Sequence, residues 1–590
     1  MNHSINISES FNAKNTTIKN LCETFIPNSY YDKLASPNHT VLIGPRGSGK
    51  TTLMRMLDLE VINSWESDLA IDYKSKIDFQ GVFIPTDRFW KTQYTKIIER
   101  YSSNVKKIQL TNSVFTYHIL ERFVNTINYK IKNHCTESKI FSKDDELELV
   151  QILSSLWKVE PRISSLRGLG IAVTEKKLEI SNLIKKNEEY LLDIDYIDQD
   201  AVSIIQSSVE VVNSIIADPN KKWAFLFDEL ELAPEQLIQP LIDYMRGGGN
   251  SSVIFKLALS PYHKDIRITN DQLSSMKGHD LTFVNMSSNH EKEAEIFSKN
   301  LCSNLFIRSG FEDEIYSYFV EPKEDDYKEY FNELSIKDKS FKSYLIKRDI
   351  LGCLSGTVDD NKMSLVRKVK FIARLRNYYR KDNNSIKPRR RAPNFYAGFK
   401  NICKSVEYNP RMLISMMSEF IRIMKQDGEK KLSIHIQIHY LNQQCEHFKA
   451  LLSTIAIESK DEKIKNIFDL INIIGHEFSE QIHGNNFRDK PKSTFFIKNQ
   501  DDKDLIEAVG LALNAGAIIA ENKSNSATID IINIGDERFR LSYIFSHEYK
   551  TLLSLGSEID LNEILNSNNY STSFKVVPLL FKVPQMEMDV

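Results

Sequence analysis

Eight consecutive residues near the start of the chain have the types and spacing that bind phosphate. They match the pattern G-x-x-x-x-G-K-[ST] at every fixed position: Gly44, Pro45, Arg46, Gly47, Ser48, Gly49, Lys50 and Thr51. The glycines let the backbone turn its N–H groups inward, around phosphate oxygens. Lys50 can then reach the β- and γ-phosphates, and the Thr51 hydroxyl can bind Mg²⁺. This Walker A loop, to which we add Thr52, predicts a nucleoside triphosphate site rather than a turn that binds nothing.

The elements that must position this loop are present on both sides of it. An apolar run at residues 40–43 predicts a buried strand, and residues 49–59 have helical spacing. Just before that strand, the aromatic residues Tyr30 and Tyr31 either contact the base of the nucleotide or pack in the core.

Two acidic residues that could take part in catalysis follow another apolar run. Residues 223–227 predict a strand buried on both faces, and Asp228 and Glu229 follow directly. This pattern is typical of a Walker B motif, because the carboxyl end of a strand in an open α/β sheet faces the ligand crevice. Asp228 would hold Mg²⁺, and Glu229 would orient and deprotonate the attacking water.

Three more apolar runs, at residues 81–86, 252–259 and 281–286, predict strands, and residues 234–246 and 291–301 predict helices. Ser260 follows one strand directly, so it is either a sensor of the γ-phosphate or an ordinary strand-end serine. Five strands alternating with helices predict an α/β fold, a three-layer P-loop domain. Residues 91–217 have helical periodicity and predict a large helical insertion, with a loop at residues 168–170.

Length and composition limit the number of domains, the partners and the location that we expect. A chain of 590 residues is expected to form two to four domains, and its formal charge of −2 gives no overall attraction to nucleic acid or membrane. No apolar run is long enough to span a bilayer and the first residues are polar, so we expect a cytoplasmic protein. The six cysteines are widely spaced, which favours free thiols over a disulfide or zinc framework.

With both motifs in place, the chain resembles the AAA+ ATPases, in particular the origin-recognition-like clade and its STAND-type relatives. Asn409-Pro410-Arg411 resembles the sensor 2 motif of their helical lid, which implies that Arg411 contacts the γ-phosphate. The resemblance also implies ATP, Mg²⁺ and an oligomer in which a neighbouring subunit supplies an arginine. Arg246 and Arg267 are the weak candidates for that arginine.

The C-terminal part is predicted from both pattern and resemblance. Residues 504–514 predict a helix, residues 517–520 a strand, and residues 529–534 with 539–544 a hairpin. Residues 515–519 resemble the end of the recognition helix of a winged helix, and residues 535–541 resemble its wing. The predicted helix carries no Lys or Arg after Lys503, so we expect a protein-interaction module rather than a DNA-binding one. Residues 433–440 alternate as a strand does.

One segment departs from the near-neutral charge of the chain. Residues 362–391 carry twelve basic residues and a single acid, Asp382, with Phe371, Tyr378 and Tyr379 among them. Such a stretch, especially residues 367–391, either follows a nucleic-acid backbone and stacks bases or is a solvated helix that contacts acidic protein surface.

These patterns lead to one expected organisation. It comprises an N-terminal arm (1–20), an AAA+ core (21–290), a helical lid (291–430) and a winged-helix-like domain (431–590). The expected function is an Mg²⁺-dependent ATPase that acts as a conformational switch. Residues 227–234 resemble bacterial members found in antiviral defence loci, which implies a sensor or regulator of a separate effector protein, beside the oligomer that the AAA+ resemblance implies. The alternatives are a DNA-binding initiator or loader and a nucleotide-binding scaffold without hydrolysis.

Overall fold

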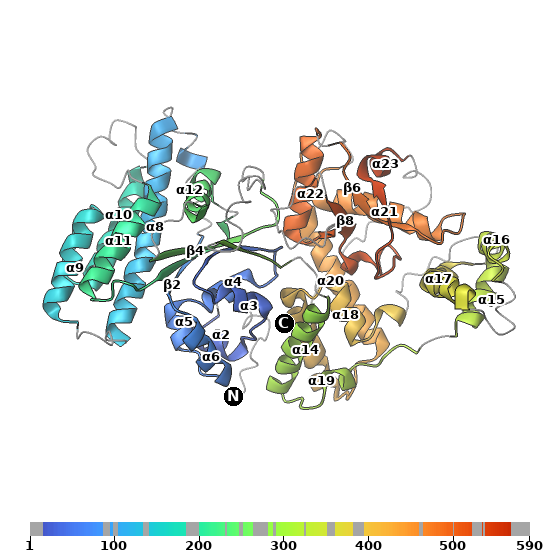
Figure 1. Ribbon diagram of the computed structural model, residues 1–590. Coiled ribbons are helices and arrows are strands. Elements are labelled where there is room, and N and C mark those ends of the chain that lie inside the picture. The colour runs from blue at the N-terminus through green and yellow to red at the C-terminus, as the bar shows by residue number, and fades with distance from the viewer. Residues whose placement is uncertain are drawn as a thin grey trace, which may run out of the picture.

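The computed structural model describes residues 16–86, 95–97, 99, 104–133, 141–183, 200–230, 233–246, 252–263, 281–286, 291–323, 326–350, 360–381, 394–458, 464–499, 501–521, 534 and 537–567. Figure 1 shows two lobes. The first sheet and the helical insertion form the left lobe, and the segments that follow residue 290 form the right one.

The left lobe is built on a five-stranded parallel sheet. Its strands are β1 (His39–Ile43), β2 (Gln80–Pro85), β3 (Trp223–Asp228), β4 (Val253–Leu259) and β5 (Leu281–Asn285). They lie in the order β2-β3-β4-β1-β5, and every pair is parallel. The five predicted strands are therefore confirmed, and β4 separates the strand that leads to the Walker A loop from the strand that ends in the Walker B acids.

Alternate residues of the strands point to the two faces of this sheet, as pleating requires. On one face Leu42, Leu226 and Ile254 pack against short helices. These helices are α2 (Ile18–Thr24), α3 (Ser29–Leu34), α4 (Lys50–Arg55), α5 (Leu59–Asn63) and α6 (Asp68–Lys76). The helix predicted at 49–59 is thus divided between α4 and α5, and Asp58 caps the start of α5.

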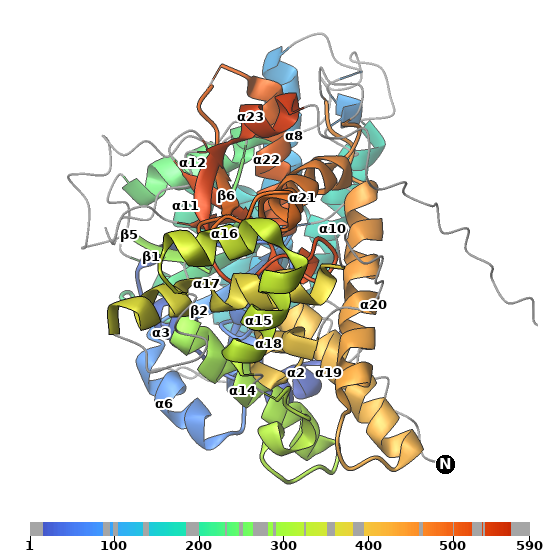
Figure 2. The ribbon, with the colours of Figure 1, turned by 90° about the vertical axis from the view of Figure 1, so that its right-hand side faces the viewer.

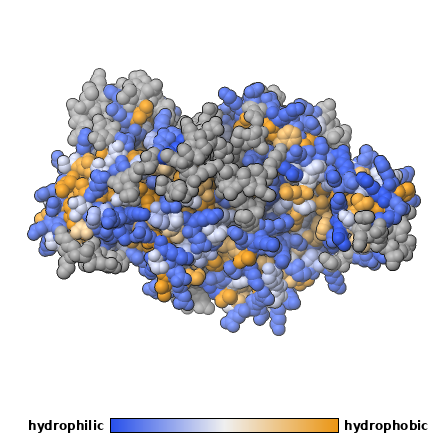
Figure 3. All heavy atoms as spheres, viewed as in Figure 1, coloured by the Kyte–Doolittle hydropathy of each residue, from blue (hydrophilic) through white to orange (hydrophobic). Residues whose placement is uncertain are grey.

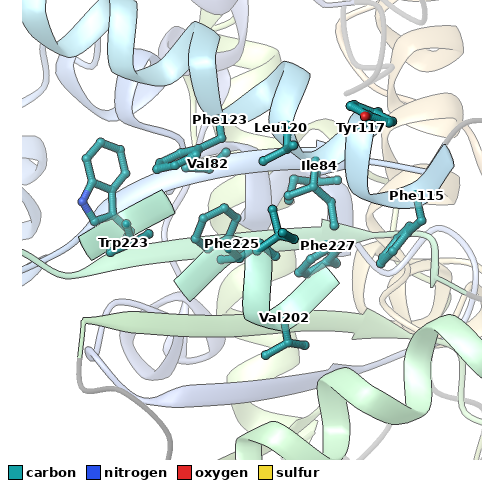
Figure 4. Close-up of a cluster of buried hydrophobic side chains, with 14 of the residues drawn as sticks. Val82, Ile84, Phe115, Tyr117, Leu120, Phe123, Val202, Trp223, Phe225 and Phe227 are labelled. Carbon is teal, nitrogen blue, oxygen red and sulfur yellow. The ribbon is translucent and has the colours of Figure 1, made fainter. Parts of the chain in front are cut away.

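The other face is covered by the helical insertion. Its described helices are α8 (Asn104–Asn133), α9 (Lys143–Leu156), α10 (Leu166–Leu183) and α11 (Ala201–Ile215), together with α12 (Glu235–Arg246) after β3. Figure 4 shows Phe115 and Phe123 of α8 lying over Phe225 and Phe227 of β3. The insertion is therefore one of the three layers of the domain and not a separate appendage.

The insertion corrects one local prediction. Residues 168–170 lie inside α10 and are not a loop. A Cβ on Gly168 would lie 2.0 Å from the Ile163 carbonyl oxygen, so this glycine serves close packing rather than chain reversal. The insertion also leaves Ile163, Ile171 and Leu178 exposed, and Figure 3 shows apolar surface at this end of the molecule.

The right lobe begins with helices. They are α14 (Glu291–Arg308), α15 (Tyr327–Lys337), α16 (Lys339–Lys347), α17 (Asp360–Tyr379), α18 (Phe399–Ser405), α19 (Pro410–Asp427) and α20 (Ile434–Ser453). Figure 2 shows the long α20 at one side and α15 to α17 at the front. The strand predicted at 433–440 is wrong, because the Ser433 side chain accepts a hydrogen bond from the Ile436 N–H and so starts α20.

The C-terminal part forms a second sheet with the order β7-β8-β6-β9. Its elements are α21 (Ile467–His483), β6 (Lys492–Phe496), α22 (Lys503–Ala515), β7 (Ile518–Glu521), β8 (Arg538–Leu541), β9 (Ser557–Asp560) and α23 (Leu561–Asn566). The predicted helix and first strand are present. The hairpin prediction differs from the structure, because β8 has β7 and β6 as its two neighbours, and residues 529–533 lie outside the described residues.

Candidate functional site

The phosphate loop follows the carboxyl end of β1 and leads into α4. The Gly44 N–H donates to the Leu259 carbonyl at 3.1 Å, which fixes the loop to the end of β4. Lys50 is buried, and its Nζ donates to the Gly44 and Pro45 carbonyls at 2.5 and 3.3 Å. The ammonium group is therefore held inside the curve of the loop, where phosphate oxygens would replace those carbonyls as its partners.

Two glycines adopt backbone conformations that the loop needs. Gly47 and Gly49 have φ values of +85° and +97°, in the left-handed region that favours glycine. A Cβ on Gly47 would also lie 2.9 Å from Asn409 Oδ1 and 3.2 Å from the Arg411 Cβ. The loop is thus a cradle of backbone atoms closed by α19, and it fits a phosphate group but no additional side chain.

The Walker B acids lie at the end of β3. Asp228 is fully buried, and its carbonyl accepts hydrogen bonds from the Thr86 N–H at 3.1 Å and the Thr86 hydroxyl at 2.6 Å. Glu229 has a φ of +54°, which is uncommon for a residue with a side chain. Backbone strain of this kind gathers at functional sites, and here it turns the chain away from the sheet immediately after the two carboxylates.

The tip of β4 is held by the C-terminal part of the chain. Ser260 is buried there, two residues before Tyr262. The Asn514 side chain accepts from the Tyr262 N–H at 2.8 Å and donates to the Tyr262 carbonyl at 2.7 Å, while the Asn514 carbonyl accepts from the Arg46 N–H at 2.9 Å. One residue at the end of α22 thus contacts both the phosphate loop and the β4 tip.

The start of α19 meets the same loop from the right lobe. Asn409 caps this helix, accepting from the Arg411 N–H at 3.1 Å, and its Nδ2 donates to the Arg46 carbonyl at 3.2 Å. Partial burial and the Arg46 charge lower the pKa of Arg411, while the Glu229 carboxylate raises it. The structure therefore brings Arg411, the Walker A loop and Glu229 together, although they are far apart in sequence.

A groove runs beside the loop, at the junction of the two lobes. It has a cavity volume of about 270 Å³, and Tyr30, Pro45, Ser48, Phe297 and Pro410 lie along it. A second hollow of about 80 Å³ adjoins it and reaches Gly49 and Thr52. The two aromatic residues singled out before β1 have different places. Tyr30 lines the groove, and Tyr31 is buried with its hydroxyl donating to the Met56 carbonyl at 2.9 Å.

The remaining predicted site residues are placed less favourably. Arg246 ends α12 with a side chain only 15% exposed and a nitrogen 3.8 Å from the Asp243 carboxylate. Arg267 lies outside the described residues. Of these two candidates the structure describes only Arg246, and its side chain is not an exposed one.

Part of the basic stretch has a structural role. Arg376 of α17 and Arg380, which directly follows this helix, are buried and donate to the Asp338 carboxylate at 2.6 and 3.1 Å. Arg367 and Lys368 are exposed, and residues 382–393 lie outside the described residues. Two of the twelve basic residues are therefore unavailable to a phosphate backbone.

Two broader expectations concern membranes and cysteines. None of the helices that the structure describes is long and apolar enough to cross a membrane. Cys22, Cys302, Cys403 and Cys445 are buried free thiols. Cys135 and Cys353 lie outside the described residues.

Sequence reasoning missed the contacts made by Thr86, Asn514 and Tyr262. Thr86 follows a strand directly, which is a recognisable position, since the carboxyl ends of parallel strands meet at one edge. Asn514 offers no such signal, because it ends a helix more than 450 residues after the loop that it contacts.

Comparison with known proteins agrees with this geometry. The family model described as ORC-CDC6-like matches residues 6–561, which include both lobes. No curated protein and no solved structure matches the chain. The family match covers far more than half of the sequence, and the parallel sheet with its phosphate loop is consistent with an AAA+ ATPase domain. The chain therefore belongs to the ORC-CDC6-like family of AAA+ P-loop ATPases.

Proposed function

We propose that this protein hydrolyses ATP in the presence of Mg²⁺ at the junction of its two lobes. The observation that carries the proposal is the meeting of three separate elements at one loop. The start of α19 lies against the Walker A loop at Gly47, and Arg411 is close enough to Glu229, at the end of β3, for their charges to interact. A loop that only terminated a strand would need neither a buried lysine nor an arginine from another lobe.

The residues present fit ATP and Mg²⁺. The backbone of residues 44–51 forms a cradle for phosphate oxygens, and Lys50 already lies within it. Thr51 and Asp228 are the proposed Mg²⁺ ligands, since hydroxyl and carboxylate oxygens suit this ion. Bound Mg²⁺ would neutralise charge on the phosphates.

Glu229 is the proposed general base, which orients the attacking water and accepts its proton on a carboxylate oxygen. Arg411 and Ser260 are proposed to contact the γ-phosphate from the lid and from the β4 tip, and the planar guanidinium suits two parallel hydrogen bonds.

The groove beside the loop is the proposed site of the base and ribose. Tyr30 and Phe297 provide apolar and aromatic surface there, and Asn28 provides polar contacts. Such sites usually combine an apolar lining with a few polar groups. This assignment makes the α14 and α19 part of the right lobe a lid over the nucleotide.

This arrangement supports action as a switch. The phosphate loop in the core and Arg411 in the lid would hold the same triphosphate, so its cleavage would release one lobe from the other. We propose residues 291–430 as the lid and residues 431–590 as a winged-helix-like domain that transmits the movement. An oligomer or a separate effector protein, in the setting of bacterial antiviral defence, is the proposed reader.

One observation favours the DNA-binding alternative. Phe371 is 56% exposed beside the basic residues of α17, and the Lys370 Nζ lies 4.7 Å from its ring. An exposed aromatic ring among cations can stack a base. Binding of single-stranded DNA that weakens with salt, and weakens further in the Phe371→Ala variant, would support this function.

Replacing Lys50 by Ala tests the proposed function. We expect the variant to lose ATP binding, measured by titration calorimetry, while Lys33→Ala, an exposed change in α3, retains it. Light scattering with and without ATP shows whether the nucleotide also drives assembly. Equal ATP binding by the two variants would contradict the proposed site. ATP binding by the unmodified protein without any turnover would instead support the non-hydrolysing scaffold.

A further inference from the structure

The turn that presents Arg411 to the phosphate loop has an unusual backbone. Glu407 and Tyr408 follow α18 and have φ values of +57° and +53°. Two consecutive non-glycine residues in the left-handed region are unfavourable, and such a conformation persists only when surrounding contacts impose it. The turn ends at Asn409, which caps α19.

Those contacts come from the C-terminal sheet. Arg540 of β8 is 4% exposed, and its two terminal nitrogens donate to the two Glu407 carboxylate oxygens at 2.5 and 2.8 Å. Its Nε donates to Glu521 at 2.6 Å, and its guanidinium carbon lies 4.0 Å from the centre of the Tyr543 ring. The carboxylates therefore hold the edge of the guanidinium, and the Tyr543 ring covers its face.

The backbone of the C-terminal part adds a second contact to the same carboxylate. The Tyr543 N–H donates to Glu407 Oε1 at 2.6 Å. A bidentate pair inside a protein sets orientation as well as distance, and a lysine at position 540 could not reproduce it. Glu407 thus cannot rotate away from the C-terminal sheet while Arg540 holds it.

The Glu407 turn is linked to the phosphate loop by residues that follow it within four positions. Asn409, two residues after Glu407, bonds the Arg46 carbonyl, and the Arg411 Cβ packs against Gly47. A change in the Glu407 turn would therefore shift Arg411 relative to the loop.

We propose that Arg540 is a positioning residue for ATP hydrolysis, which through Glu407 holds the turn that aims Arg411 at the γ-phosphate. This inference rests on the proposed function of the site. It assigns to the C-terminal sheet a direct part in hydrolysis, because movement of that sheet by a partner would alter the position of Arg411.

The Arg540→Lys variant tests this role, and Arg538→Lys is its matched control. Arg538 lies on the same strand, but its side chain bonds Thr494 and Gly556 within the C-terminal sheet. We expect Arg540→Lys to lower kcat by roughly 10-fold with little change in KM, because misplacement of a group near the reaction mainly affects the transition state. Arg538→Lys should leave kcat unchanged.

A double-mutant cycle with Arg411→Ala separates positioning from general destabilisation. If Arg540 acts through Arg411, Arg540→Lys should have no further effect on kcat in the Arg411→Ala background, while any fall in Tm should be the same in both backgrounds. Amide exchange of the peptide 404–413 should become faster in Arg540→Lys and not in Arg538→Lys.

The outcomes distinguish this inference from the proposed function. An unmodified protein that does not hydrolyse ATP would contradict the proposed function. Hydrolysis that Arg540→Lys lowers equally in both backgrounds would overturn only the positioning role, and so would exchange of 404–413 that is unchanged in this variant.

Discussion

Asp338 forms the centre of a buried ionic cluster, and its replacement gives a sharp prediction. The carboxylate, at the start of α16, accepts hydrogen bonds from the Arg376 and Arg380 Nε atoms and from the Ser340 hydroxyl at 2.6 Å. Arg376 and Arg380 also donate to the Gly484 carbonyl at 2.8 and 2.7 Å. The cluster links the helical unit of α15, α16 and α17 to the end of α21, and so attaches this unit to the C-terminal part of the chain.

The pKa of Asp338 gives one measure of this cluster. Burial alone would raise it, but the Arg376 and Ser340 contacts outweigh burial and lower it from 3.8 to about 2. At about 1.4 kcal/mol per pH unit, this difference corresponds to about 2.5 kcal/mol of stability. Because the folded pKa is the lower one, this stability is present above about pH 4 and is lost as the pH falls towards 2.

Asp338→Asn removes the carboxylate to which both buried arginines, Arg376 and Arg380, donate hydrogen bonds. Leaving buried charges without a counter-charge costs about 3–5 kcal/mol. Amide exchange in α17 should therefore become between about a hundredfold and a few thousandfold faster. Asp326→Asn is the control, since Asp326 also caps a helix, at the Lys328 N–H, but is exposed. Asparagine caps helices as well as aspartate, so little change is expected there. Equal exchange in the two variants would refute the reasoning.

Three further predictions concern the packing around the site. Burial, with Lys177 and Arg122 nearby, lowers the pKa of His118 to about 4, so only the unfolded chain gains that proton between about pH 6.5 and 4. Stability should fall by up to about 3 kcal/mol over this range, and His118→Gln should show a weaker fall of Tm with acid. Asn514→Ala removes both bonds to Tyr262 and should cost about 1–3 kcal/mol in thermal unfolding, and Asn514→Asp should cost at least as much, because it sets a carboxylate oxygen against the Tyr262 carbonyl; an unchanged Tm in both variants would contradict this. Phe123→Ala should lower the free energy of unfolding by about 3–5 kcal/mol, against about 0.5 for the exposed Ile171→Ala, and a loss below about 1 kcal/mol would show that α8 is not part of the core.

The sheet and the phosphate loop could be predicted because their signals are local. A strand buried on both faces must be continuously apolar, and β3 is buried along its whole length. The Walker A pattern likewise fixes glycine positions that the backbone requires, as the φ values of Gly47 and Gly49 show. Such constraints act within a few residues and therefore remain visible in the sequence.

The errors arose where local patterns had two physical meanings. Residues 433–440 alternate, but Ser433 is a helix cap and the long α20 imposes its own spacing. Residues 168–170 contain two glycines, which here permit close packing inside α10 and do not end a helix. The basic stretch is similar, because its charge does not reveal that Arg376 and Arg380 turn inward to Asp338.

The contacts between distant segments could not have been predicted from patterns at all. Arg46 of the left lobe is joined to Asn409 and to Asn514, and Glu407 is joined to Arg540 within the right lobe, across distances in sequence of more than 100 residues. These pairs depend on how elements far apart in sequence pack, which periodicity does not encode.

We propose that the loop, Asp228 and Glu229 form one hydrolytic site. The most direct test is the rate of ATP hydrolysis with Mg²⁺, for the unmodified protein and for Glu229→Gln, with ATP binding measured in both. We expect turnover by the unmodified protein that chelation of Mg²⁺ abolishes, and a Glu229→Gln variant that binds ATP normally but hydrolyses it at least about 100-fold more slowly. Turnover by Glu229→Gln at the unmodified rate would contradict the account.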